Sequence, residues 1–550
     1  MSKYNLRIWI TFLLITSFIF IIIIRLFNLQ VQNHEFYKKK SKYQQERIIK
    51  LSPKRGNIYD RNGDVLGVSL EAISLYANPR QIKNKKEAAN ELHEQLGLSP
   101  RRVSNIINNS GHFVWIKRKV SARYKKTLRI SGVHFLPDTK RYYPNNEIAA
   151  HVLGFVGVDD KGLSGLEYYH NSELAGKSGS MIIESDLKGR NIFSYAKKVV
   201  PAKEGDDVFL TIDKNIQFYM EEQLEIAVKN CKAKSAVAVL MDVKTGEIYG
   251  MANYPSFNPN YFQRFEDQSV FKNNAVSMAY EPGSVMKLFT IAAALEENVI
   301  QLDTPIYSPL RIVVGGYPIE EAYHSGAEKE SPTKSVSDVI VKSLNVGAAK
   351  IGLKLGKEKL HQYLSQLDFG KKTGIQLPGE SYGMLSPYQK WYQVDLSRIA
   401  FGYGVSVTPI QLLRAVAVFA NDGYLVSPYI IKGAKKKSRR KVFSKKTVEV
   451  MKTFMQKTVE EGTATKTKLN RYTVGGKTGT SRLFSTRINK YLIGQYNSSF
   501  AGIFPVSNPR FAMVVVVHDP RRNKYASYSA VPAFKGIAER VLRYMDIKPQ

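Results

Sequence analysis

The chain has 550 residues, 43% of them hydrophobic and 23% charged, which is enough for two or three globular domains with full cores. Its 81 lysines and arginines exceed its 47 acidic residues and give a formal charge of +34, which suits an anionic membrane surface, an acidic polymer or nucleic acid. The single cysteine, Cys231, excludes an intrachain disulfide and a cysteine-rich metal site. The nine histidines form no His-Glu-x-x-His motif, so we expect neither a metal nor a cofactor.

The N-terminal segment contains one long apolar run. Residues 8–24 carry no charge, and the apolar pattern continues past Arg25 to residue 29. This length matches the roughly 20 residues that cross a bilayer as a helix. No small-x-small cleavage site follows, so we predict an uncleaved, single-pass anchor rather than a signal peptide. Lysines and arginines lie on both sides of the run, so the positive-inside rule does not decide its orientation.

Residues 31–205 mix many short helical and extended patterns, which predicts an α+β region. Within it, Asn62-Gly63 lies between two extended stretches and is typical of a β-hairpin. Gly176-Lys177-Ser178 resembles the end of a phosphate-binding loop, but Asn171 stands where that loop needs its first glycine. We therefore expect a structural loop at this point.

From residue 206 the pattern changes to longer strands and helices. We predict a strand at 208–212, helices at 216–228 and 530–545, and two β-hairpins, 236–242 with 247–252 and 500–504 with 511–518. Antiparallel hairpins with helices between and after them predict an α+β domain in which helices cover an antiparallel sheet. The basic run 435–441 has no interleaved aromatic residues, so we interpret it as a solvated loop and expect no nucleic-acid partner.

One motif stands out because of its surroundings. Pro282-Gly283 predicts a turn, and the residues from 284 to 295 are apolar on almost every side of a helix, which is typical of a buried one. Ser284 and Lys287 are three residues apart and therefore share a face. A buried lysine has a lowered pKa, so its neutral amine can take a proton from a serine hydroxyl and activate it as a nucleophile.

Ser-x-x-Lys alone is weak evidence, because the chain contains five other copies. They begin at Ser185, Ser194, Ser269, Ser331 and Ser438. All five lie in polar, basic or proline-flanked segments, and only Ser284 begins an apolar helix. Taken by itself, Ser284 is explained about equally well as a catalytic nucleophile and as a helix-capping serine that happens to precede a lysine.

Two further motifs favour a catalytic interpretation. Ser343-Leu344-Asn345 lies between predicted helices at 336–341 and 346–355, where Ser343 is expected to shuttle a proton and Asn345 to hold a substrate amide. Lys477-Thr478-Gly479-Thr480 follows a strand-like stretch. On an edge strand Gly479 would let a substrate lie close, while Lys477, Thr478 and Thr480 would offer a carboxylate a charge and two hydroxyls. The backbone N–H groups of Ser284 and Thr480 are candidates for an oxyanion hole.

Each of these motifs also has copies elsewhere in the chain. Ser256-Phe257-Asn258 has the Ser-x-Asn form, and Lys-Thr-Gly recurs at Lys244 and Lys372. The two extra Lys-Thr-Gly copies lie in a predicted turn and a glycine-flanked loop, so we interpret them as turn chemistry. The specificity lies in the order and context of the three motifs, which together are the signature of penicillin-binding proteins and serine β-lactamases.

The resemblance extends over nearly the whole chain. The chain resembles the class B penicillin-binding proteins, most closely the septal cell-division D,D-transpeptidases of the FtsI type. The resemblance is carried by the anchor and by the stretches 55–63, 162–167, 241–259, 281–287, 401–411, 475–480 and 488–491. The resemblance implies an anchor at 1–30, an elongated, non-catalytic pedestal of the dimerisation type at 31–205, and a transpeptidase domain at 206–550. It implies that Ser284 is the nucleophile, Lys287 its base and Ser343 the proton relay. In the same way Asn345 and Thr480 would position the peptide, and Lys477 and Thr478 would bind the terminal carboxylate of the donor.

The same resemblance implies partners and a location. The substrates would be peptidoglycan stem peptides on lipid II-derived glycan strands, and β-lactams would be inhibitors. No glycosyltransferase module precedes the pedestal, so we expect glycan polymerisation to come from the SEDS protein FtsW, beside other division proteins. The catalytic domain would be periplasmic, on a single-pass anchor in the inner membrane, and the basic excess would face anionic lipid and cell-wall polymer.

Two departures and two alternatives stay open. Leu344 occupies a position where a small or polar residue is common, and Ser481 one where alanine is usual, which leaves the fine substrate and antibiotic preference undetermined. An elongation-type transpeptidase of the side wall would use the same chemistry. A D,D-carboxypeptidase or β-lactamase relative is the other alternative. A deacylating glutamate with asparagine four residues later, as in class A β-lactamases, is not found among Glu358, Glu380, Glu449, Glu460 and Glu461.

Overall fold

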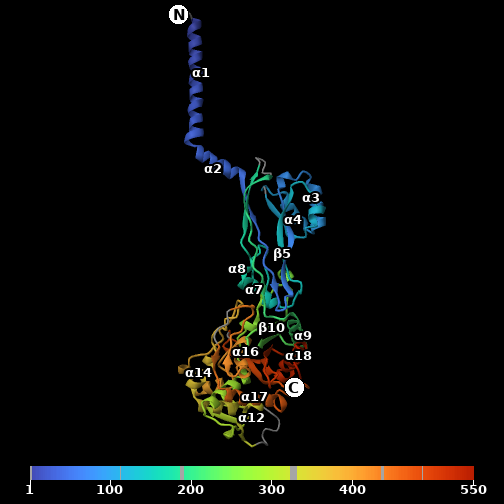
Figure 1. The fold of residues 1–550 in the computed structure, drawn as a ribbon, viewed down its shortest axis with the longest axis vertical. Coiled ribbons are helices and arrows are strands. Elements are labelled where there is room, and N and C mark those ends of the chain that lie inside the picture. Colours follow the sequence, from blue (N-terminus) through green and yellow to red (C-terminus); the bar gives the residue numbers. More distant parts are fainter. Residues whose placement is uncertain are drawn as a thin grey trace. The chain divides into compact units, whose positions relative to one another are not determined.

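The computed structural model describes residues 3–111, 113–185, 191–321, 331–434, 439–485 and 487–549, without the side chains of 42–51 and 183–198. Figure 1 shows the fold. The chain forms two compact units, one made of Met1–Arg55 with Ala175–Gly205 and the other of Gly56–Leu174 with Asp206–Gln550. The boundaries predicted from the sequence, at 30 and 205, stay a prediction.

The first unit carries the apolar helix. Helix α1 (Lys3–Phe27) continues through a π-helical turn (Asn28–Gln32), and α2 (His34–Gln45) follows. The segment Lys3–Gln32 is long and apolar enough to cross a membrane, and none of it is buried in protein. This confirms the predicted N-terminal apolar helix. Exposed isoleucine, leucine and phenylalanine side chains on every face of a helix are stable in lipid and costly in water.

A three-stranded antiparallel sheet completes this unit. Its order is β1 (Glu46–Leu51), β6 (Gly179–Ser185) and β7 (Asn191–Val200). Just before β6, Lys177 and Lys203 exchange both backbone hydrogen bonds as an isolated bridge. The Gly176-Lys177-Ser178 stretch is therefore part of strand pairing, as its structural interpretation predicted.

In the second unit, Gly56–Leu174 forms a small α+β body. Its strands are β2 (Ile58–Tyr59), β3 (Val65–Ala77), β4 (Val114–Val120) and β5 (Val133–Tyr142), and β3 pairs with the other three. Asn62-Gly63 turns the chain between β2 and β3, with Gly63 at φ +93°, so the predicted hairpin is present. Helices α3 (Lys85–Leu96) and α4 (Pro100–Ile107) pack on one side around a core that includes Leu75, Leu92 and Ile116.

This body joins the rest of the unit through strand pairing. β2 lies parallel to β8 (Val208–Phe209), and Leu210 bridges to Ile431. The strand predicted at 208–212 is thus shorter than expected, because only its first residues find a neighbouring strand. Helices α6 (Ala150–Leu153), α7 (Gly165–Tyr169) and α8 (Asn171–Leu174) complete this region.

The remaining residues build one antiparallel sheet between two helical layers. Its order is β10 (Ile248–Tyr254), β9 (Ser235–Asp242), β19 (Phe511–His518), β18 (Lys490–Phe504) and β17 (Gly475–Ser485). Both predicted hairpins are present, as β9–β10 and β18–β19. The fold is therefore the predicted α+β arrangement, with helices covering an antiparallel sheet.

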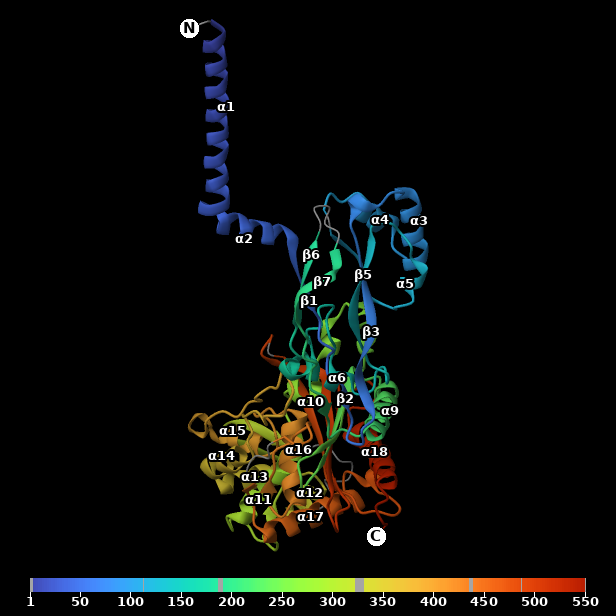
Figure 2. The same cartoon turned by 45° about the horizontal axis from the view of Figure 1, so that its top comes forward.

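Strand β19 explains why the sheet is covered on both sides. Met513, Val515 and Val517 belong to one core, whereas Ala512, Val514 and Val516 belong to the other. Alternate residues of a strand point to opposite faces, so a strand that is apolar at every position needs cover on both. Helices α9 (Lys214–Cys231) and α18 (Ala530–Tyr544) pack together on the first face, as Figure 2 shows.

The other face is covered by a layer of helices, among them those that hold the first two motifs. They include α11 (Lys287–Glu296), α12 (Val336–Val341), α13 (Asn345–Leu355), α16 (Pro409–Ala417) and α17 (Lys445–Glu460). Helices α10 (Asn274–Ser277), α14 (Lys357–Gln366) and α15 (Gln393–Ile399) and the short strands β11 (Ile306–Tyr307), β12 (Arg311–Val314), β13 (Tyr317–Glu320) and β14 (Thr333–Lys334) surround them.

The basic run 435–441 differs from its prediction in part. Residues 435–438 lie outside the described residues. Arg440 and Lys441 form β16, a short exposed strand that pairs with β15 (Tyr424–Leu425) instead of remaining a loop.

Candidate active site

Ser284 lies on a short 3-10 turn that leads directly into α11. The turn spans Gly283–Met286, and every residue of α11 from Lys287 to Ala294 is buried, as the apolar pattern predicts. Gly283 has φ +54°, which favours glycine, and a Cβ added there would lie 3.0 Å from the carbonyl oxygen of Thr480. The glycine therefore allows the turn that carries Ser284 to pack against the strand that carries Thr480.

Lys287 is fully buried, and its amine faces the second motif. Its Nζ donates hydrogen bonds to the Ser343 carbonyl oxygen (2.5 Å), Ser343 Oγ (3.3 Å) and Asn345 Oδ1 (2.8 Å). Burial lowers the pKa of Lys287 to about 7, and the negative charge of Glu321 opposes part of that shift. Near neutral pH a large fraction of this amine is therefore unprotonated and able to accept a proton.

The second motif forms a tight turn between two helices. Ser343 has φ +62°, a left-handed conformation that non-glycine residues rarely adopt. The turn ends α12, begins α13 at Asn345 and directs the Ser343 carbonyl at Lys287. The predicted helices at 336–341 and 346–355 are thus both present, and the strained residue between them lies at the amine.

The third motif lies on β17 beside the Ser284 turn. Lys477 is fully buried, and burial, followed by the positive charge of Lys287, lowers the pKa of Lys477 well below its usual value. A Cβ on Gly479 would lie 2.7 Å from the carbonyl oxygen of Pro282, so glycine is required for this close approach. Thr478 Oγ1 is 2.8 Å from the hydroxyl of Thr463.

The structure thus brings all eight predicted site residues into one region. Hydrogen bonds join the first and second motifs, and the packing of Gly283 and Gly479 joins the first and third. A buried amine that titrates near neutrality, in contact with the Ser343 hydroxyl and with a second lysine in the same region, is suited to acyl transfer to a substrate with a carboxylate. Among the described residues no group of three or more His, Cys, Asp or Glu side chains is placed to hold a metal ion.

The extra copies of the motifs have ordinary structural roles where the structure describes them. Ser269 Oγ donates to Asp267, Ser331 Oγ accepts the Thr333 N–H, and Ser256 Oγ donates to the Glu147 carbonyl oxygen. Lys244 lies in the β9–β10 turn, which the Asp242 carboxylate caps. The side chains of Ser185 and Ser194, and all of Ser438, lie outside the described residues.

Glu281 is a site residue that the sequence interpretation did not single out. Its Oε1 accepts hydrogen bonds from the Gly404 N–H (2.8 Å) and the Tyr491 hydroxyl (2.9 Å), and its carbonyl oxygen accepts one from Ser481 Oγ (2.6 Å). Burial raises the pKa of the Glu281 carboxyl above its usual range. One glutamate therefore connects the Ser284 turn to three other segments. A carboxylate directly before a buried Pro-Gly turn was the available signal.

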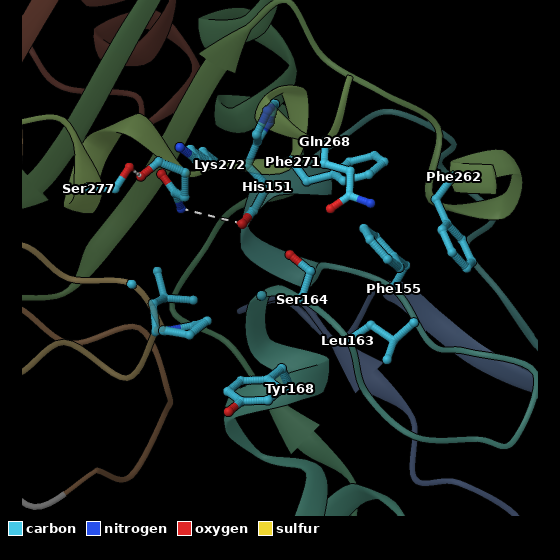
Figure 3. Close-up of a pocket in the computed structure, with 15 residues that line it drawn as sticks. His151, Phe155, Leu163, Ser164, Tyr168, Phe262, Gln268, Phe271, Lys272 and Ser277 are labelled. Carbon is cyan, nitrogen blue, oxygen red and sulfur yellow. Dashed lines mark hydrogen bonds between the residues drawn. The ribbon is translucent and has the colours of Figure 1, made fainter. Parts of the chain in front are cut away.

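A separate cavity lies away from these residues. It has a volume of about 520 Å³ and includes Phe155, Phe262 and Phe271 in its wall, with His151 and Lys272 nearby (Figure 3). The Phe155 and Phe262 rings stack with their centroids 4.1 Å apart. None of the eight site residues lines this cavity.

Comparison with known proteins gives consistent similarities. Residues 236–539 match the penicillin binding protein transpeptidase domain family, and residues 50–210 match the penicillin-binding protein dimerisation domain family. The chain is 34% identical over 524 residues to stage V sporulation protein D of Bacillus subtilis, covering 92% of this chain and 80% of that protein. It is 31% identical over 538 residues to the peptidoglycan D,D-transpeptidase FtsI of Escherichia coli, covering 95% and 89%.

Solved structures of penicillin-binding proteins have a similar fold over most of this chain. Penicillin-binding protein 3 of Mycobacterium tuberculosis, in complex with aztreonam, has a TM-score of 0.71 and 26% identity to this chain, covering 91% of this chain and 98% of that one. The two family matches together cover the body built from Gly56–Leu174 and the sheet that carries the third motif.

Proposed function

The chain belongs to the class B penicillin-binding proteins, and from this premise we propose that it cross-links peptidoglycan at the division septum through an acyl-enzyme on Ser284. As a member of this family it is a serine-type peptidoglycan D,D-transpeptidase. The septal role and the roles of individual residues are the proposal.

The observation that carries the residue assignment is the environment of Lys287. Its amine is fully buried, contacts both polar residues of the second motif and has a pKa of about 7. A lysine with an unperturbed pKa would be protonated at neutral pH and could not act as a base. Here the neutral form is accessible, one helical turn from the Ser284 hydroxyl.

The first half of the reaction forms the acyl-enzyme. Lys287 takes the Ser284 proton as Oγ attacks the carbonyl carbon of the penultimate D-Ala of a donor stem peptide. The new C–O bond replaces the C–N bond to the terminal D-Ala, and the proton passes through Ser343 to the leaving amine. Backbone N–H groups of Ser284 and Thr480 would stabilise the oxyanion of the tetrahedral intermediate.

The second half transfers the acyl group. An amine of a second stem peptide attacks the ester carbon, loses a proton to Lys287 and forms the cross-linking amide, and Ser284 Oγ takes the proton back. A water molecule in place of that amine would give the carboxypeptidase reaction, and a β-lactam in place of the donor would leave a stable acyl-enzyme.

Binding of the donor is assigned to the second and third motifs. Lys477 and Thr478 would bind its terminal carboxylate, Asn345 and Thr480 would hold the peptide, and Gly479 would let the peptide lie along β17. The hydrogen-bond partners of Lys477 Nζ in the described site are two oxygens of Thr478, at 3.3 and 3.4 Å. A carboxylate would complete this partly satisfied site.

The septal assignment rests on the resemblance to division transpeptidases, and the Escherichia coli relative FtsI supports it. A sporulation protein is also among the relatives, and a side-wall enzyme would use the same chemistry. Within this proposal FtsW supplies the glycan strands, since the transpeptidase domain acts only on peptides. Imaging a fluorescent fusion separates the two roles, because a septal enzyme gathers at midcell in dividing cells and a side-wall enzyme is distributed along the cell body.

We also infer that α1 anchors the protein in the inner membrane as a single pass, with the transpeptidase domain in the periplasm. The support is the apolar segment Lys3–Gln32 together with a cell-wall substrate. Protease added to spheroplasts should digest the transpeptidase domain. Protection of that domain until the membrane is lysed would place it in the cytoplasm and contradict the assignment.

The experiment that tests the chemistry is labelling of the purified protein with a fluorescent penicillin, followed by mass spectrometry of the labelled peptide. The proposal requires a covalent adduct on Ser284 that persists for much longer than the labelling reaction.

A further inference from the structure

Helix α13 begins beside the proposed base, but its own sequence provides no N-cap. The N-cap position is Leu344, whose side chain has no group that can accept a hydrogen bond, and no side-chain cap is formed there. The first N–H groups of a helix have no partner within it, and leaving them unsatisfied in a partly buried site is costly. Their acceptor must therefore come from another segment.

Glu321 supplies that acceptor from the end of the β12–β13 hairpin. Its Oε2 accepts a hydrogen bond from the Asn345 N–H (2.5 Å), and its Oε1 accepts one from the Val346 N–H (2.9 Å). The Ser308 hydroxyl donates to the same Oε1 at 2.8 Å and helps to fix the carboxylate. Both oxygens of one carboxylate are thus used at a helix N-terminus, where negative charge is favourable.

The preceding residue orients the Asn345 side chain. The Glu320 carbonyl oxygen accepts a hydrogen bond from Asn345 Nδ2 at 2.9 Å, so Asn345 Oδ1 points the other way, to Lys287 Nζ at 2.8 Å. Two consecutive residues of the hairpin therefore fix both the backbone and the amide of Asn345. Since Asn345 contacts the amine directly, a displaced hairpin would displace a partner of the proposed base.

Glu321 also acts on Lys287 through its charge. Two titratable side chains act with the Lys287 amine in the described site: the negative charge of Glu321 acts on Lys287, and the charge of Lys287 in turn lowers the pKa of Lys477. Glu321 favours the protonated form of Lys287, opposite to the effect of burial. Its contribution keeps the pKa of Lys287 from falling further below 7.

We propose that Glu321 is a positioning residue of the transpeptidase reaction, which holds the Ser343–Asn345 turn against Lys287 and sets the pH range in which Lys287 works. This inference rests on the proposed function, because it assumes that Lys287 is the base for Ser284. It adds a residue outside all three motifs, on a hairpin that precedes the second motif by more than twenty residues.

The test is the pH profile of acylation in the full-length protein. The second-order rate of labelling by a fluorescent penicillin is measured from pH 5 to 9 for wild type, Glu321→Gln and Glu321→Asp. Glu321→Gln removes the charge and one of the acceptors. We expect its rate at the high-pH plateau to fall by about tenfold or more, and its acid limb to move roughly one unit toward lower pH. Glu321→Asp keeps the charge, so its limb should stay at the wild-type pH even where its rate is reduced.

Glu358→Gln is the matched control, because Glu358 is an exposed glutamate in the first turn of the neighbouring helix α14. Its profile should match wild type. The comparison of wild type with Glu321→Gln is repeated in a Lys477→Ala background. Because the Lys477 amine is then absent, an acid limb that remains in the pH–rate profile belongs to Lys287.

The outcomes separate this inference from the proposed function. No adduct on Ser284 in wild type would refute the proposed function itself. A normal wild-type adduct with a Glu321→Gln rate reduced by the same factor at every pH would give Glu321 a purely structural role and overturn the inference. An unchanged Glu321→Gln rate would overturn it as well. If Glu321→Gln fails to fold, the Glu321→Asp profile decides: an acid limb displaced from its wild-type position contradicts the inference, because the charge is retained.

Discussion

The buried amines of Lys477 and Lys287 repel each other across the site, and this repulsion adds to burial in lowering the pKa of Lys477. Two fully buried cations cannot both be charged at low cost unless an anion lies between them. A ligand carboxylate would therefore favour the charged form of Lys477 while leaving Lys287 free to act as a base.

Lys477→Ala should weaken acylation by β-lactams that carry a carboxylate. The loss of one charged hydrogen bond in a partly dry site costs about 1.5–3 kcal/mol, or roughly 10- to 150-fold in acylation efficiency. The measurement is the second-order acylation rate by stopped-flow or gel fluorescence. Lys244→Ala is the control, because Lys244 belongs to a Lys-Thr-Gly copy in the β9–β10 turn. Equal rates for wild type and Lys477→Ala would exclude carboxylate binding by Lys477.

The acylation rate of the wild type should depend on pH through Lys287. The amine is active when neutral, and its pKa is about 7. Below that pH the protonated fraction dominates, so the rate should fall about tenfold for each further unit of acidification, and above it the rate should level off. Labelling rates in a series of buffers from pH 5 to 9 test this. A flat profile between pH 5 and 7 would show that Lys287 is not the base.

The local elements were predictable because their patterns are strong. The apolar run of α1, the alternating hairpins and the buried face of α11 each follow from one periodicity in a short window. The Ser284 motif was found in the same way, since only Ser284 begins a helix whose every face is apolar. The other two motifs were selected by the order and context of all three. The proposed oxyanion hole of Ser284 and Thr480 already required their two segments to lie together, although the packing of Gly283 and Gly479 that allows it was not visible in the sequence.

The supporting residues could not be predicted because their partners are far away in sequence. Glu321 caps a helix that begins 24 residues later, and Glu281 binds the Tyr491 hydroxyl across 210 residues. No local pattern encodes such contacts. The buried Pro-Gly turn after Glu281 marks that residue as a candidate but does not give its partners. The strand predicted at 208–212 was too long for a related reason. The observed strand β8 ends at Phe209, where its neighbour β2 also ends.

The free energy of unfolding should depend on pH through Glu221. Compared with the Glu221→Gln variant, the wild type should be more stable in acid than in base. Glu221 is partly buried on α9, where its Oε1 accepts hydrogen bonds from the Ala149 N–H (2.9 Å) and from Gln217 Nε2 (2.7 Å). Burial raises the pKa of Glu221 from 4.5 to about 7. Its contribution to stability is therefore fully present below pH 4.5 and is lost as the pH rises through about 7, by about 3 kcal/mol in total.

Glu221→Gln keeps the acceptor oxygen and removes the titration, so it should raise the melting temperature at pH 8 and change it little at pH 5. Thermal denaturation followed by circular dichroism at both pH values measures this. Glu225→Gln is the control on the same helix, since the Glu225–Lys229 pair is exposed and water screens its charges. A Glu221→Gln shift that is equal at the two pH values would mean that Glu221 does not titrate in this range.

Ser284→Ala should abolish acylation without unfolding the protein. The change removes the only oxygen able to form the proposed acyl bond. Ser284 Oγ makes no hydrogen bond to another described residue, and alanine is the better helix former, so stability should change by less than about 1 kcal/mol. Lys287→Ala should also lose labelling, because a serine hydroxyl without a base is a weak nucleophile.

The other Ser-x-x-Lys serines give the matched set of controls for this prediction. Alanine at Ser185, Ser194, Ser269, Ser331 or Ser438 should leave labelling at the wild-type level, since none of these serines begins a buried apolar helix. Mass spectrometry of penicillin-treated wild type should find one adduct, on the peptide that contains Ser284. The adduct should be long-lived, because no glutamate between the second and third motifs has asparagine at the spacing of a deacylating residue. An adduct on another serine, or rapid release of hydrolysed penicillin, would replace the transpeptidase mechanism with a different nucleophile or with a β-lactamase, respectively.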